Sequence, residues 1–294
     1  MTDLPPTERE NPQSAGLDLL STPELVEVIV ADQRSAVDAA FAQTPQIART
    51  IDSIAQRLAD GGHLHYVGAG SSGRIAMLDA SEMPPTFGTE SELVQAHVAG
   101  GAAALVRSME GAEDDAQAGA AVVRDFVRSG DAVIGLSASG SAAYVVTAVE
   151  RSNALGALTI AVTSVADSPL ARAAGIAIVL ETGAEVLAGS TRLKAGTAQK
   201  IVLNAISTGV MIRLGKVYDN LMVDVVASNR KLHGRALRLI EQLARVDERR
   251  ARELLAAAGG RVKVAVVMER RQVDAAHARA LLERHDGALR PLLQ

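Results

Sequence analysis

Two short segments rich in glycine and serine could bind a phosphate group. Residues 68–73 read Gly-Ala-Gly-Ser-Ser-Gly and residues 137–141 read Ser-Ala-Ser-Gly-Ser, and each segment lies between an apolar run and a helical pattern. Glycine lets the backbone approach a ligand closely, a helix N-terminus offers unpaired N–H groups and partial positive charge, and serine adds hydroxyl donors. These features predict phosphate binding by Ser71, Ser72, Gly73, Ser137, Ser139 and Ser141.

Other interpretations of these segments remain open on the residues alone. Residues 68–73 also satisfy the Gly-x-Gly-x-x-Gly pattern of dinucleotide sites, but the next apolar run ends at Val98-Ala99-Gly100-Gly101, without the acidic residue that a ribose hydroxyl requires. Either segment alone could be a tight turn of small residues. A Walker-type nucleotide loop is excluded, because no Gly-Lys-Ser/Thr follows the first segment.

Two glutamates near these segments are candidates for acid–base catalysis. Glu82 ends a helical pattern just before Pro84-Pro85, where the helix dipole opposes a negative charge and raises a carboxyl pKa, as a general acid requires. Glu113 lies in an acidic cluster before another helical pattern. A solvated turn residue at Glu82 and ordinary helix capping at Glu113 are the alternatives.

Residues 189–200 form a third segment dense in hydrogen-bond donors. Ser190 or Thr191 could cap a long helix, and Arg192 and Lys194 would then lie in its first turn, where cations oppose the helix dipole. A bound anion would explain this arrangement, which makes Ser190 and Lys194 candidate substrate-binding residues. A basic surface on an amphipathic helix is the alternative.

The elements that position these residues follow from the order of apolar runs and helical patterns. Short apolar runs alternate with helical segments of about 10–15 residues, which is typical of parallel βαβ units; the runs cover 63–67, 94–98, 131–136, 158–163 and 176–180. This order predicts an α/β protein with a doubly wound, mostly parallel sheet flanked by helices. Ligands of such sheets bind beyond the carboxyl ends of the strands, where both segments fall.

The chain divides into three parts by pattern. Residues 1–20 are expected to be a flexible tail, 21–245 one large α/β domain, and 246–294 a small helical C-terminal module. Ser21-Thr22-Pro23-Glu24 predicts a helix start, and further helices are expected at 46–59, 190–213 and 223–246. Residues 261–268 alternate as a strand would, so their type is uncertain.

Composition narrows the classes of function. Of the 294 residues 48% are hydrophobic but only 2% aromatic, and the net charge is −4, which argues against a nucleic-acid surface. There is no cysteine, and the six histidines show no metal-ligand spacing. The polar N-terminus does not resemble a signal peptide and no apolar stretch is long enough to span a membrane, so we expect a cytoplasmic protein.

Several longer strings resemble the N-acetylmuramic acid 6-phosphate etherase family, whose members contain a sugar-isomerase (SIS) domain. The resemblance covers roughly residues 20–270 and lies in residues 68–74, 79–88, 110–114, 188–200, 215–218 and 220–225. It implies a SIS-type fold, a homodimer, no metal or organic cofactor, and cleavage of the lactyl ether of N-acetylmuramic acid 6-phosphate to N-acetylglucosamine 6-phosphate and D-lactate in cell-wall recycling. By position, Glu82 is similar to the family's proton donor and Glu113 to its second catalytic acid/base.

The chain departs from the family pattern at three places. Met83 stands where many members have Cys, Ser141-Ala142 replace the usual Arg-Thr, and Asp219 replaces a common Gly. The second departure puts substrate recognition in question. A sugar-phosphate aldose–ketose isomerase and a non-catalytic sugar-phosphate sensor are the competing functions, and the string around Glu82 favours the etherase. In a dimer, His233 is a candidate to reach the neighbouring subunit's site.

Overall fold

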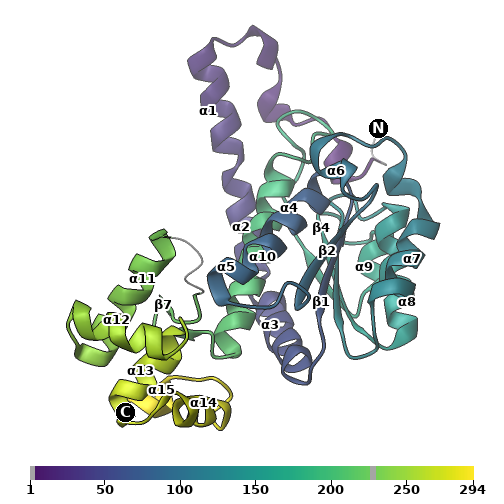
Figure 1. The fold of residues 1–294 in the computed structure, drawn as a ribbon. Helices are drawn as coiled ribbons and strands as arrows, with labels where there is room; N and C mark the ends of the chain where they lie inside the picture. The colour runs from purple at the N-terminus through teal and green to yellow at the C-terminus, as the bar shows by residue number, and fades with distance from the viewer. Residues whose placement is uncertain (1–3, 226–229) are drawn as a thin grey trace. The chain divides into compact units, whose positions relative to one another are not determined.

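The computed structural model describes residues 4–225 and 230–294 (Figure 1). Contacts divide the chain into two units, one of residues 1–80 and 92–207 and one of residues 81–91 and 208–294. The second unit therefore includes residues 81–91 and 208–245 besides residues 246–294. That residues 246–294 form a module of their own stays a prediction.

The first unit is built on a five-stranded parallel sheet of order β2-β1-β3-β4-β5, which confirms the predicted fold class. Its strands are β1 (Leu64–Gly68), β2 (Val94–Val98), β3 (Ala132–Leu136), β4 (Leu158–Thr163) and β5 (Ile176–Val179). Every residue of β1 and β3 is buried, as expected of central strands covered on both faces. The largely apolar strand segments of the sequence reflect that double coverage.

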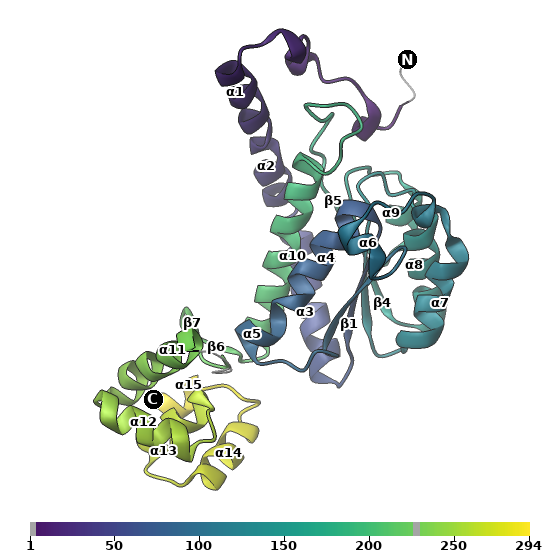
Figure 2. The same cartoon turned by 45° about the horizontal axis from the view of Figure 1, so that its top comes forward.

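Helices cover both faces of the sheet, as Figures 1 and 2 show. One face carries α3 (Thr44–Ala59), α4 (Gly70–Ser81) and the first part of α10 (Lys194–Arg213), and the other carries α7 (Ala116–Phe126), α8 (Ala143–Leu155) and α9 (Pro169–Ala173). The chain leaves β1 toward β2 and leaves β3 toward β4, in opposite directions. The sheet therefore has its topological switch point between β1 and β3, where open α/β sheets bind ligands.

The N-terminal region begins with three single 3₁₀ turns, followed by α1 (Thr22–Asp32) and α2 (Arg34–Ala42). The predicted helix start is confirmed, since the Glu24 carboxylate accepts a hydrogen bond from the Ser21 backbone N–H at 2.9 Å. Within the segment expected to be a flexible tail, Thr7 is buried and its carbonyl accepts a hydrogen bond from the Gly189 N–H at 3.1 Å. This part of the tail thus lies against the loop that precedes α10.

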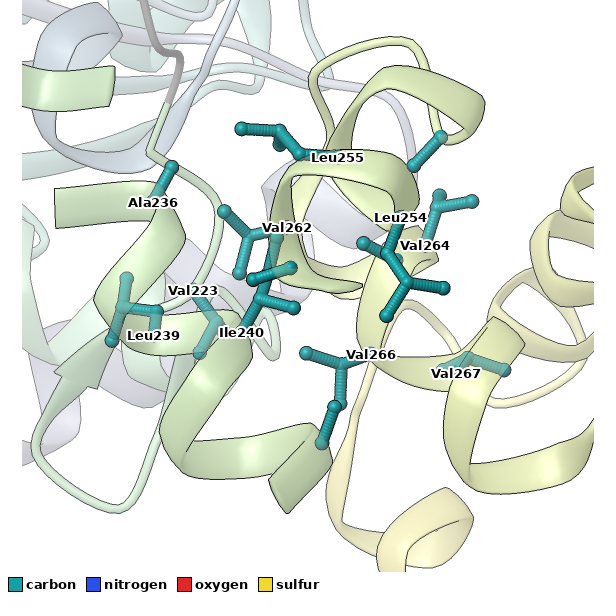
Figure 3. Packing of buried hydrophobic residues seen from close by; sticks show 14 of the residues in the cluster. Val223, Ala236, Leu239, Ile240, Leu254, Leu255, Val262, Val264, Val266 and Val267 are labelled. Atoms are coloured by element: carbon teal, nitrogen blue, oxygen red, sulfur yellow. The ribbon is translucent and has the colours of Figure 1, made fainter. Parts of the chain in front are cut away.

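The C-terminal helices of the second unit share one apolar core, shown in Figure 3. They are α11 (Arg230–Ile240), a π-helical turn (Glu241–Arg245), α12 (Glu248–Ala257), α13 (Val262–Arg271), α14 (Ala275–Glu283) and α15 (Arg290–Leu293). Residues 261–268, whose alternation resembled a strand, belong mostly to α13. All residues from 262 to 267 are buried, because other helices surround α13, and a helix buried on every side loses its amphipathic period.

Lys263 of α13 ties this core to a two-stranded hairpin formed by β6 (Val217–Tyr218) and β7 (Leu221–Met222). Its ammonium donates to the carbonyls of Gly215 and Gly287 at 2.9 and 2.7 Å and lies 2.7 Å from the Asp224 carboxylate. Burial lowers the pKa of Lys263, and Asp224 opposes that shift. Asp219, between β6 and β7, has φ 54°. Glycine adopts this left-handed conformation more easily than aspartate, which explains why glycine is favoured at this position.

Candidate active site

The first glycine–serine segment forms the end of β1 and the first turn of α4. Helix α4 begins at Gly70, inside the glycine–serine segment. This start requires glycine at two positions, because a Cβ on Gly73 would lie 2.8 Å from the Gly68 carbonyl oxygen and a Cβ on Gly68 would lie 2.8 Å from Gly73 Cα. The helix thus starts directly against the strand end.

Ser71 and Ser72 occupy that first turn with their hydroxyls free. Neither side chain makes a hydrogen bond to any residue within 4–225 or 230–294. The first N–H groups of a helix have no intrahelical partner and carry partial positive charge. Two hydroxyl donors and this helix terminus together suit a phosphate dianion.

The second segment forms a turn after β3, and its serines bond to one another. Ser139 Oγ lies 2.8 Å from Ser141 Oγ and 3.5 Å from Ser137 Oγ, and Ser137 Oγ accepts the Gly140 N–H at 3.1 Å. Gly140 has φ 68°, and a Cβ there would lie 2.2 Å from Ser168 Oγ. The backbone of this turn is therefore fixed by sterics as well as by hydrogen bonds.

The tertiary structure brings these two segments together at the switch point. Gly68 at the end of β1 pairs with Leu136 at the end of β3, so both segments leave the same edge of the sheet at the same level. The sequence predicted two loops at carboxyl strand ends, and the strand order makes those ends adjacent. A ligand at this edge could contact both segments.

The two candidate catalytic carboxylates belong to different units. Glu113 is exposed on a 3₁₀ helix, η4 (Ala112–Asp114), which follows β2 and packs against α8. Glu82 is exposed between α4 and α5 (Met83–Phe87), in the second unit.

Asp79 is a buried residue of α4 that the sequence reasoning missed. Its carboxylate accepts hydrogen bonds from Tyr66 Oη at 2.9 Å, Asn204 Nδ2 at 2.6 Å and Ser207 Oγ at 3.1 Å. These bonds join α4 to β1 and α10, and burial with the Asp79 charge raises the pKa of Tyr66. The available signal was an acidic residue three positions after Ala76, on the apolar face of the helix.

Lys194 and Ser190 lie at the start of α10, but in different environments. The predicted helix begins at Lys194 rather than at 190, because the buried Glu185 carboxylate accepts the N–H groups of Lys194 and Ala195 at 3.1 and 3.0 Å. Lys194 Nζ bonds to Asp32 at 2.8 Å, and both side chains are buried. Ser190, half-buried, makes no side-chain hydrogen bond to the described part of the chain.

This helix terminus is already neutralised by the protein. Desolvation raises the pKa of Glu185, while the two N–H donors and Lys194 oppose that shift. Arg192 lies before the helix rather than in its first turn, so the dipole conflict predicted for it does not arise. Of the two candidates here, Ser190 is the one whose side chain is free to bind a substrate.

Two kinds of feature are absent from residues 4–225 and 230–294. No cluster of three or more histidine or acidic side chains with metal-binding geometry occurs among them. No helix among them has the length and apolar character needed to cross a bilayer.

Comparison with known proteins gives consistent relatives over nearly the whole chain. The sequence is 52% identical over 261 residues to the N-acetylmuramic acid 6-phosphate etherase of Symbiobacterium thermophilum, covering 89% of this chain and 87% of that protein. The etherase of Gloeobacter violaceus is 51% identical over 284 residues, covering 96% and 93%, and that of Salmonella agona is 46% identical over 289 residues, covering 98% and 97%.

A family model and a solved structure match the sheet region. Residues 46–153 match the model of the glucokinase regulatory protein N-terminal SIS domain. A phosphoheptose isomerase from Francisella tularensis superposes with a TM-score of 0.51 at 19% identity, covering 66% of this chain and 99% of that one. This second likeness concerns the fold alone.

Proposed function

This chain belongs to the N-acetylmuramic acid 6-phosphate etherase family, and we propose that Glu82 and Glu113 are the acid and the base of its reaction. The enzyme is a carbon–oxygen lyase that converts N-acetylmuramic acid 6-phosphate and water into N-acetylglucosamine 6-phosphate and D-lactate. The residue roles rest on the family strings around both glutamates and on their exposure.

An alkyl ether resists direct hydrolysis because an alkoxide is a poor leaving group, so an elimination route fits better. Opening of the sugar ring exposes the C1 aldehyde, which acidifies the proton on C2. Glu113 as a carboxylate removes that proton, and Glu82 as a carboxylic acid protonates the ether oxygen while lactate leaves C3. Water then adds across the C2–C3 double bond and returns a proton to C2 and a hydroxyl to C3.

The phosphate anchors the substrate in this proposal. The observation that carries it is the pair of unbonded hydroxyls of Ser71 and Ser72 in the first turn of α4, beside the second serine segment. Ser190 and the serines of that second segment, 137, 139 and 141, complete the binding set. Lys194 would act through Asp32 and the start of α10 rather than by direct contact. Anchoring supplies orientation of C2 and C3 toward the acid and base.

Isotopic labelling tests the reaction and its route together. The purified protein is incubated with N-acetylmuramic acid 6-phosphate in water labelled with deuterium and ¹⁸O, and the products are analysed by mass spectrometry. D-lactate should be released, and the sugar product should carry deuterium at C2 and ¹⁸O in its C3 hydroxyl. Lactate release without label at C2 would contradict the elimination route.

Glutamine substitutions test the two roles. Glu82→Gln and Glu113→Gln should each lower kcat by about 10²- to 10⁴-fold, because general acid–base assistance is of that size. The exposed neighbours Glu90→Gln and Glu110→Gln are matched controls and should retain turnover. Near-normal kcat in Glu82→Gln would make the acid assignment wrong.

The enzyme is also proposed to act as a homodimer in the cytoplasm. Val26, Val30, Val37 and Phe41 are exposed apolar residues on α1 and α2, and such a stripe is suited to cover by a second copy. Val30→Asp with Phe41→Asp should shift light-scattering mass from dimer to monomer, and Val106→Asp, at another exposed valine, should not. His233 of α11 is exposed and is a candidate for a contact across the dimer. Cell fractionation tests the compartment.

A further inference from the structure

A cavity of about 550 Å³ lies within the first unit beside the edge strand β2. Its wall comes from α4, β2, the connection after β2, α7 and α8, and includes His97, Leu105, Asp115, Val122, Phe126 and Tyr144. No residue of either serine segment lines it. The cavity is therefore separate from the proposed phosphate site, and its size suits a small organic molecule.

Tyr144 lines this cavity and carries a polar group without a partner among the residues described. The side chain is only 3% exposed, and its hydroxyl makes no hydrogen bond to residues 4–225 or 230–294. Burial raises the pKa of Tyr144 to about 12, so the hydroxyl keeps its proton at neutral pH. A buried hydroxyl is normally hydrogen-bonded, which makes a ligand or water in the cavity its natural partner.

His97, which also lines the cavity, has a second polar atom without a partner in the described part of the chain. A chain of buried groups determines whether that ring nitrogen donates or accepts a hydrogen bond. Asp131 accepts the backbone N–H groups of His63 and Arg128 at 2.8 and 2.7 Å and lies 3.3 Å from His65 Nε2. An ionised Asp131 requires a proton on His65 Nε2, which leaves His65 Nδ1 to accept from His97 Nε2 at 3.1 Å. His97 Nδ1 is then an acceptor with no partner among the described residues.

The lining also selects the charge of an occupant. Burial lowers the pKa of His97 to about 4, so its ring is neutral at pH 7. Asp115 and Asp125 are the charged residues of the wall, and no lysine or arginine belongs to it. Asp125 is paired with Arg124 at 2.7 Å, so Asp115 is the negative charge that disfavours a phosphate or carboxylate here. The Phe126 ring lies 4.9 Å from the His97 ring between centroids and, with Leu105 and Val122, offers an apolar face.

We propose that this cavity is a second ligand site, which takes a flat, uncharged or cationic molecule that donates an N–H or O–H to His97 Nδ1 and bonds with the Tyr144 hydroxyl. Ala112 and Asp115, on either side of Glu113, both line the cavity. Asp115 also caps α7, because its carboxylate accepts the Ala118 N–H at 2.9 Å. An occupant therefore contacts the segment that carries Glu113 and alters turnover, a consequence that rests on the proposed function.

Indole and indene provide a matched pair of probes, because they share a shape and only indole has an N–H donor. Both are titrated into full-length protein with ¹⁵N-labelled histidine, followed by NMR. Indole should shift the His97 ring signals saturably, and indene should bind roughly three- to tenfold more weakly, the net effect of one hydrogen bond. Equal affinity, or no saturable shift of His97 with indole, would overturn the site.

Variants separate the cavity from the rest of the molecule. Tyr144→Phe and His97→Phe should each weaken indole binding severalfold, while His277→Phe, an exposed histidine of α14, should not change it. Unchanged binding in Tyr144→Phe and His97→Phe would overturn the ligand contacts. Saturable binding without any change in lactate release would overturn the link to Glu113 only. Absence of etherase activity in the unliganded wild-type protein would count against the proposed function and not against the site.

Discussion

The two serine segments at the switch point look alike in sequence but differ in how their hydroxyls are used. In the first, Ser71 and Ser72 lie in a helical turn and their hydroxyls make no hydrogen bond to the described part of the chain. In the second, Ser139 bonds to Ser141 and Ser137 contributes to the turn. The first segment is therefore ready to bind an anion, whereas the second must exchange internal hydrogen bonds for substrate contacts. The comparison teaches that serine content alone does not measure binding capacity.

The largest expected difference between the two segments comes from removing the serine hydroxyls of the first. Ser71→Ala with Ser72→Ala should lower kcat/KM by roughly 10²- to 10³-fold, since each removes a hydrogen bond to a charged group. Ser139→Ala with Ser141→Ala should cost only about tenfold, because the lost bonds are partly internal. Ser129→Ala, at an exposed loop serine, is the control. Steady-state kinetics measure kcat/KM for each double variant. Equal losses of kcat/KM would mean that the two segments contribute equally to substrate binding.

The second segment should instead be the more sensitive to backbone change. Gly140→Ala should lower the free energy of unfolding by about 3 kcal/mol, because it adds left-handed strain and a Cβ contact of 2.2 Å with Ser168 Oγ. Gly61→Ala, where φ is 87° with open space around the Cβ position, isolates the strain and should cost about 1 kcal/mol. Urea denaturation measures both. If the two variants lost similar free energies of unfolding, the Ser168 side chain would be able to move away from the new Cβ at little energetic cost.

The support of the first segment is a buried carboxylate network rather than its own serines. Asp79→Asn removes the charge that Tyr66, Asn204 and Ser207 bond to, and should lower stability by about 2 kcal/mol. The exposed Asp18→Asn is the control. Thermal unfolding measures the loss, which should be accompanied by a raised KM, because α4 carries Ser71 and Ser72. A destabilised variant with normal KM would separate Asp79 from substrate binding.

The smallest expected effect is on the internal bonds of the second segment. Ser139→Ala alone should change the free energy of unfolding by less than about 1 kcal/mol, because its hydroxyl is half-exposed and water can replace it. Ser14→Ala, at a half-buried serine whose hydroxyl donates to the Asn11 carbonyl at 3.0 Å, gives the size of a comparable loss. A change well above 2 kcal/mol in urea denaturation would mean that the serine network holds the turn.

The sequence by itself determined the doubly wound sheet, its strands and the place of both serine segments. Apolar runs, helical periods and glycines are local signals, so they can be recognised without knowing which distant segments contact them. The helix starting at Ser21 followed in the same way, because the residues of a capping box lie three positions apart. The family strings added the identity of the two glutamates, whose roles remain proposals.

Only the tertiary structure decided which of these features meet. The order of strands placed the segments after β1 and β3 side by side. Lys194 bonds to Asp32, which is far away in sequence, and the chain folds back so that Glu185, nine residues before Lys194, caps α10. Residues 262–267 became helical because surrounding helices bury them on every side. Such pairings depend on contacts between distant segments, which leave no periodic trace in the sequence near either partner.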